Sequence, residues 1–183
     1  KDQRERHTDQ LFVLQNLVGA EGMSKTEPVF ADETFDQETS LALGGTQIEI
    51  QMVGPAHTPG DSIVWLPKEK ILFSGDVVYI GRMLGVMPHS NSAHWIEAFE
   101  TLLAFEPQLI VPGHGEPASV QKASKDSLGY LNYLRSAVGK FMDDGGDITR
   151  IGDIDQSRYA YLVDYETLKG RNAQQVFQEM EWE

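Results

Sequence analysis

Three residues with metal-binding side chains each follow an apolar run of the sequence. They are His57 in GPAHTPGDS after the run 46–53, Asp76 in FSGDVVY after 70–75, and His114 in VPGHGEP after 108–111. Neutral imidazoles and carboxylates are ligands that zinc and non-haem iron accept, so the three form a candidate ligand set. Their spacing is long, and no local pattern such as HExxH supports the set. Each residue alone therefore also fits a surface or turn role.

The loop around His57 favours a binding role for that side chain. Two prolines restrict φ and two glycines permit positive φ in GPAHTPGD, so the loop can hold the imidazole in one direction. Asp61 and Ser62 follow directly. They are expected either to hold His57 in place from a second layer of contacts or to stabilise the turn.

The segments around these motifs alternate between strand-like and helical patterns, which predicts the α/β class. Strands are predicted over 46–53, 62–66, 70–75 and 108–111, with shorter extended pieces over 31–45 that end at Gly44–Gly45. Helices are predicted over 2–18, over 91–105 with Ser92 as N-cap, from about 119 to Gly145–Gly146, and near 172–180 with Gly170–Asn172 at the start.

Composition narrows the class of protein. The chain has 183 residues, enough for one domain with a proper core, and its formal charge is −13 from 15 basic and 28 acidic residues. A surface this acidic repels phosphates, which excludes nucleic acid as the expected partner. No apolar run approaches the ~18–20 residues of a membrane helix, so no membrane partner is expected. Without cysteine there is no thiolate site, and the composition fits cytoplasm and periplasm equally.

Taken together, HTPGDS, FSGDVVY and VPGHGEP resemble the last three metal-binding motifs of the metallo-β-lactamase-fold hydrolases. The resemblance covers roughly residues 33–117. It implies an α/β chain that is the second half of an αββα sandwich, a mixed sheet with flanking helices. It also implies a single domain over 1–183 with a C-terminal helical extension from about 119 to 183. By this resemblance His57 binds one metal, the catalytic Asp76 bridges two, and His114 binds the second. The cofactor would be zinc, two ions per complete site, with iron as the alternative.

The resemblance also implies a reaction and a substrate loop. Metal-activated hydroxide would attack an ester, a thioester or a lactam of a small molecule. Lactams come last, because true β-lactamases of this fold usually carry a residue other than aspartate at position 76. The superfamily often keeps substrate-contacting loops between its second and third motifs. A pocket is therefore expected to be lined by Met83, Leu84, Met87 and His89, although the same segment also fits a plain connecting loop.

The chain departs from the family pattern in one respect. The first motif, His-x-His-x-Asp-His, is not present, and His7 is the only histidine before His57. We therefore expect an N-terminally truncated domain with an incomplete dinuclear site, which self-associates or pairs with the missing N-terminal half. The alternatives are a non-catalytic scaffold or interaction fragment that retains the turns of the fold, and a diiron redox enzyme that would need an electron-carrying partner.

Overall fold

The computed structural model describes residues 2–23, 25–27 and 29–183, and the side chains of these residues except 2–10 and 20. The chain forms two compact units, residues 1–35 and 36–183. The first unit holds helix α1 (Asp2–Met23), which confirms the helix predicted over 2–18. The helix continues beyond the predicted end, with a kink where Gly19 adopts φ 80°.

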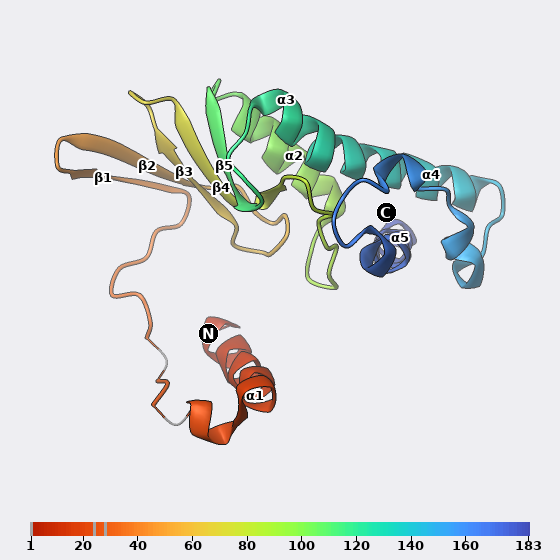
Figure 1. Ribbon diagram of the computed structural model, residues 1–183, viewed down its shortest axis with the longest axis horizontal. Helices are drawn as coiled ribbons and strands as arrows, with labels where there is room; N and C mark the ends of the chain where they lie inside the picture. The colour runs from red at the N-terminus through yellow and green to blue at the C-terminus, as the bar shows by residue number, and fades with distance from the viewer. Residues whose placement is uncertain (1, 24, 28) are drawn as a thin grey trace. The chain divides into compact units, whose positions relative to one another are not determined.

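One mixed sheet organises the second unit (Figure 1). Its strands lie in chain order: β1 (Glu38–Leu43), β2 (Thr46–Met52), β3 (Ser62–Leu66), β4 (Ile71–Tyr79) and β5 (Leu109–His114). The first four strands pair antiparallel, whereas β5 runs parallel to β4, because helix α2 (Ser92–Leu103) connects them as a crossover. A mixed sheet with flanking helices in an α/β chain confirms the predicted class.

Two element boundaries near the sheet differ from the prediction. β4 does not end at residue 75 but continues through Asp76 to Tyr79, with register shifts on both sides of Gly75. The prediction ends the strand there because Gly75 and Asp76 have the composition of a turn, whereas pairing with β5 continues past them through two irregularities of register. The N-cap of α2 is Asn91, whose side chain accepts a hydrogen bond from the backbone N–H of His94, and not the predicted Ser92.

The C-terminal part of the chain is helical. Its elements are α3 (Val120–Ala123), the π-helical turn η1 (Ser124–Leu128), α4 (Gly129–Asp143), the short 3₁₀ helices η2 (Ile148–Asp153) and η3 (Ser157–Tyr159), and α5 (Tyr165–Met180). The run predicted from about 119 is confirmed. The last helix starts earlier than predicted, so Gly170–Asn172 lie inside it, where the packing of Val176 and Phe177 outweighs the weak helix propensity of glycine. None of the described helices is both long and apolar enough to cross a membrane.

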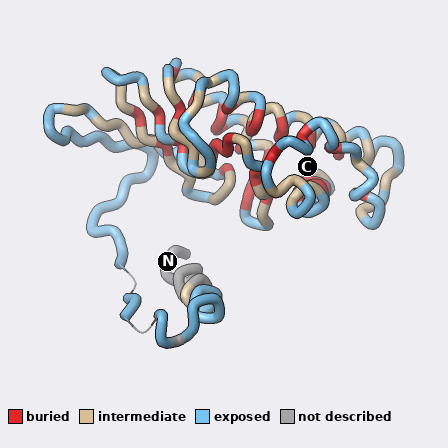
Figure 2. Tube along the Cα trace, viewed as in Figure 1, coloured by how far each residue is buried: buried red, intermediate tan, exposed pale blue. Residues whose placement is uncertain are grey.

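The sheet buries one face and leaves the other partly exposed. Buried residues concentrate where the strands meet the helices (Figure 2), and they include Ile63, Leu72 and Ile110, each 0 % exposed. Side chains alternate between faces along a strand. The cross-strand partners Ile50, Val64, Phe73 and Val111 therefore share the opposite face, where Phe73 is 40 % exposed. This second face is apolar and only partly covered.

Candidate functional site

Asp76 lies between the two histidines that the motifs singled out. Its Oδ2 lies 3.6 Å from Nδ1 of His57, and its Oδ1 lies 3.6 Å from Nε2 of His114. The exposed fractions of the side chains are 19 % for His57, 33 % for Asp76 and 43 % for His114. The structure thus brings together three residues from β4, β5 and the loop after β2, at a surface that solvent reaches.

Close pairing of β4 with β5 places Asp76 beside His114, and two glycines make this pairing possible. A Cβ atom on Gly113 would come within 2.1 Å of Oδ1 of Asp76. Gly115 has φ +100°, and a Cβ there would come within 2.1 Å of the carbonyl oxygen of Ile80. Only glycine fits at either position. The pattern PGHG is therefore explained by close packing around the imidazole it carries.

Hydrogen bonds within the loop hold the backbone that carries His57. Both carboxylate oxygens of Asp61 accept from Thr58, one from the backbone N–H and one from the hydroxyl, each at 2.7 Å. The hydroxyl of Ser62 donates to the carbonyl of Gly60 at 3.4 Å. Of the two roles expected for Asp61 and Ser62, these bonds match stabilisation of the turn next to His57.

Aromatic side chains surround the two imidazoles. The ring of Tyr79 stacks on His114 with centroids 4.7 Å apart and an interplanar angle of 26°. Trp95 packs edge-on against His57 at 5.5 Å, and its indole N–H donates to the carbonyl of Val77 at 2.9 Å. Burial, and secondly the negative charge of Asp76, raise the pKa of Tyr79, which keeps the phenol neutral. Tyr79 is the last residue of FSGDVVY, but neither Tyr79 nor Trp95 was among the predicted site residues.

The four residues expected to line a pocket lie in two different environments. Met83 and Leu84 are completely buried, and their side chains belong to the hydrophobic core. Met87 is partly buried and His89 is exposed. The ring of His89 lies 6.1 Å from that of His57 in an edge-on arrangement. His89 is therefore the member of this set whose position near the three candidate ligands is best supported.

Two cavities of the described surface lie away from these residues. One, of about 430 Å³, is lined by β1, β2 and β3 together with Phe105, and the other, of about 340 Å³, lies between β2 and α2. Neither is lined by Asp76 or His114. Because reactive side chains and not cavity size define a site, we locate the candidate site at the open surface around Asp76.

The distances between Asp76 and the two imidazoles are compatible with metal coordination. Ligands about 2.1 Å from a tetrahedral ion lie roughly 3.4 Å from one another, close to the 3.6 Å that separates Asp76 from each imidazole. Within the described part of the chain, however, no group of three or more His, Cys, Asp or Glu side chains is arranged around one ion. The side chain of His7 lies outside the described residues. The arrangement is that of one carboxylate between two imidazoles, not of three ligands around one point.

A protein-family model matches more than half of the chain. The family model described as the Metallo-beta-lactamase superfamily matches residues 3–114. An acyl-coenzyme A thioesterase from Gallus gallus is 26 % identical over 109 residues, which are 57 % of this chain and 39 % of the relative. A type 2 metallo-beta-lactamase from Elizabethkingia meningoseptica is 26 % identical over 98 residues, which are 51 % of this chain and 39 % of the relative. The chain thus spans well under half of these relatives.

Two solved structures are also similar to this chain. A metallo-beta-lactamase from Pontibacter korlensis is 32 % identical, with a TM-score of 0.51 over 62 % of this chain and 53 % of that protein. A sec-alkylsulfatase from Pseudomonas sp. is 16 % identical, with a TM-score of 0.63 over 79 % of this chain and 26 % of that protein. At this low identity the second likeness concerns the fold alone. It extends over more of the chain than the first.

Proposed function

Because the chain belongs to the metallo-beta-lactamase superfamily, we propose that it provides metal ligands to the active site of a metal-dependent hydrolase. In this proposal His57 and His114 would hold metal on either side of Asp76, and both positions would share the Asp76 carboxylate. The observation that carries the proposal is that each oxygen of Asp76 faces a different imidazole at 3.6 Å. The names of the relatives, a thioesterase and a lactamase, favour hydrolysis as the class of reaction.

The metal would be zinc, with iron as the alternative. When bound, such ions lower the pKa of a coordinated water to about 7 and polarise a substrate carbonyl. The three side chains place about two ligands on each metal position, whereas structural and catalytic sites commonly have three or four. The remaining ligands would come from water or from groups other than these three. Both imidazoles must be neutral to bind metal, so uptake should weaken in acid.

Other residues of the chain would orient the ligands and meet the substrate. The neutral Tyr79 ring supports one face of His114, and Trp95 packs against His57. His89 is exposed 6.1 Å from His57, within reach of a molecule bound at the metal positions. We propose a small-molecule ester or thioester before a lactam, because true β-lactamases of this fold usually carry a residue other than aspartate at position 76. The net charge of −13 disfavours a nucleic-acid substrate.

Hydrolysis assays on the zinc-loaded protein test this proposal. A p-nitrophenyl ester, an acyl-coenzyme A thioester and a chromogenic β-lactam would be offered to the unsubstituted chain and to Asp76→Asn. Asp144→Asn provides a control on the exposed surface of the helical region. We expect zinc-dependent turnover of the ester or thioester that Asp76→Asn abolishes and Asp144→Asn retains. Turnover that does not depend on Asp76 would contradict the role of this residue as a ligand. No turnover with any substrate despite bound zinc would argue for the scaffold alternative.

A further inference from the structure

Side chains from the C-terminal helices hold the segment that follows β4. Ser127 accepts a hydrogen bond from the backbone N–H of Tyr79 at 2.9 Å and donates one to the Tyr79 carbonyl at 2.7 Å. The neighbouring Asp126 accepts from the backbone N–H of Gly81 at 2.8 Å. Both side chains are completely buried. Residues 79–81 are therefore fixed by two consecutive residues that lie more than forty positions later in the chain.

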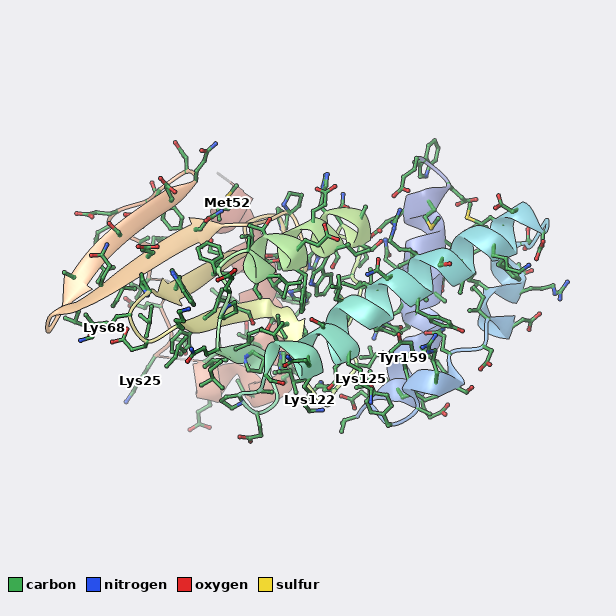
Figure 3. The ribbon with its side chains drawn as sticks, turned by 90° about the horizontal axis from the view of Figure 1, so that it is seen from above. Lys25, Met52, Lys68, Lys122, Lys125 and Tyr159 are labelled. Carbon is green, nitrogen blue, oxygen red and sulfur yellow. The ribbon has the colours of Figure 1, made fainter. Side chains whose placement is uncertain are left out.

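The π-helical turn η1 explains how two consecutive residues point toward the same strand end. A π-helical turn is wider than an α-helical one, and such turns occur frequently at functional sites. Asp126 is held in turn by Lys122, whose Nζ lies 2.9 Å from Oδ2, and by the hydroxyl of Tyr161, 2.8 Å from Oδ1. Lys122 and Lys125 are labelled at this point of the helical run in Figure 3. The carboxylate thus accepts hydrogen bonds from three donors, which hold it in one position.

Residues 80–91 form the loop between β4 and α2, and Asn172 of helix α5 holds the middle of this loop. Its Oδ1 accepts from the backbone N–H of Val86 at 2.9 Å, and its Nδ2 donates to the carbonyl of Leu84 at 2.8 Å. Asn172 is completely buried, and its Nδ2 also donates to the hydroxyl of Tyr130 at 3.0 Å. The amide thus pairs with the loop backbone as a neighbouring strand would.

A third attachment, also from α5, lies where the loop enters α2. Glu179 accepts hydrogen bonds from the backbone N–H of Ser92, at 3.0 Å, and from the Ser92 hydroxyl. Arg135 of α4 donates to the same hydroxyl at 2.8 Å. The loop is therefore attached at its start, middle and end to helices that lie outside the matched family region, which ends at residue 114.

The attached segment contacts both candidate ligand positions. The hydroxyl of Ser90 donates to the backbone carbonyl of His57 at 2.7 Å, and the N–H of Asn91 donates to the carbonyl of Ala56 at 2.9 Å. At the other end, Tyr79 stacks on His114. Each histidine is thus connected to the C-terminal helices through a continuous series of hydrogen bonds and ring contacts.

We propose that the C-terminal helices, residues 120–180, set the positions of His57 and His114 around Asp76, with Asn172 and Ser127 as positioning residues. The consequence for metal binding rests on the proposed function, whereas the attachment of the loop does not. If the buried polar groups served only to satisfy the core, their loss would lower stability without changing the order of the His57 loop.

Hydrogen–deuterium exchange of the metal-free chain tests the positioning directly. Asn172→Leu removes both bonds to the loop and retains side-chain volume, and Asn132→Leu is the control on the exposed face of α4. We expect exchange in 81–91 and in 54–58 to rise at least about tenfold in Asn172→Leu and not in the control. Unchanged exchange in 54–58 in a folded variant would overturn the proposal. If Asn172→Leu does not fold, Asn172→Asp, which keeps the acceptor for Val86 and loses the donor to Leu84, is judged by the same criterion.

Zinc titration adds a readout that a purely structural role would not change. Zinc affinity should fall about tenfold in Asn172→Leu and Ser127→Ala, and remain unchanged in Asn132→Leu and Ser136→Ala. Reduced melting temperature with unchanged zinc affinity would overturn the positioning role. If the unsubstituted protein takes up no zinc, the proposed function fails, and the exchange result alone then decides whether the helices position His57.

Discussion

Replacing Gly113 by alanine tests the packing that places Asp76 beside His114. The added Cβ would lie 2.1 Å from Oδ1 of Asp76 and 2.7 Å from the carbonyl carbon of Gly75, whereas ordinary contacts begin at 3.4 Å. The contact with Asp76 would therefore be about 1.3 Å too short, and the contact with Gly75 about 0.7 Å too short. The carboxylate can rotate away, but the backbone of Gly75 can move only if β4 separates from β5. We expect a loss of about 2 kcal/mol of unfolding free energy, the usual range for overpacking.

Two measurements on Gly113→Ala separate stability from metal binding. A loss of about 2 kcal/mol corresponds to a fall of roughly 4–8 °C in melting temperature for a chain of this size. Displacement of Asp76 should also lower zinc affinity at least about tenfold. Gly152→Ala is the control, because a Cβ there meets nothing within 4 Å. Unchanged melting temperature would refute the packing argument, and unchanged zinc affinity in a destabilised variant would refute the role of Asp76.

Three further predictions concern the remainder of the chain. Burial alone would raise the pKa of Asp126, but the hydrogen bonds that the carboxylate accepts, led by the one from Lys122, outweigh burial and hold the pKa below 3.8. The stability that the ionised carboxylate gives the folded chain is therefore present above pH 3.8 and is lost in acid. Asp126→Asn should lower the free energy of unfolding by about 1–3 kcal/mol at neutral pH. The fall in stability below pH 3.8, measured by urea unfolding, should become smaller in this variant, and an unchanged fall would contradict the prediction. Burial raises the pKa of Glu179 above 4.5, so the stability it contributes below pH 4.5 is lost as pH rises through the folded pKa. Glu179→Gln should therefore remove a decline in melting temperature between acid and neutral pH, and persistence of that decline would exclude Glu179 as its source. Finally, the apolar sheet face around Phe73 and the exposed edge strand β1 should make the isolated chain self-associate, and Phe73→Lys should reduce this association in light scattering. A monomeric unsubstituted chain would contradict this prediction.

The sequence predicts the sheet best where local pattern and burial agree. Ile48 and Ile50 alternate with polar neighbours, which is the period of a half-buried strand, and β2 forms there. β4 is predicted too short because Gly75 and Asp76 have the composition of a turn, whereas pairing with β5 carries the strand through them. The start of α5 is missed for a similar reason, since tertiary packing tolerates Gly170 inside the helix.

Some residues of the candidate site can be found from the sequence, and others cannot. His57, Asp76 and His114 can be found from sequence because each lies at or near the end of an apolar run, and ends of neighbouring strands meet in space. Asn172 and Ser127 cannot be found in this way. Their backbone partners after β4 lie 48 or more residues away, and a polar residue within a helix gives no local sign of which backbone it will contact. Their role follows only from the packed structure.

Zinc stoichiometry and affinity, measured by calorimetry and elemental analysis on the purified chain and on Asp76→Asn, test the central claim most directly. If Asp76 bridges metal positions held by His57 and His114, the unsubstituted chain should bind one or two zinc ions. Asp76→Asn should then lose them, while Asp144→Asn retains them. A folded chain that binds no zinc, or an Asp76→Asn variant that binds zinc as well as the unsubstituted chain, would contradict the assignment of these three residues as a metal site.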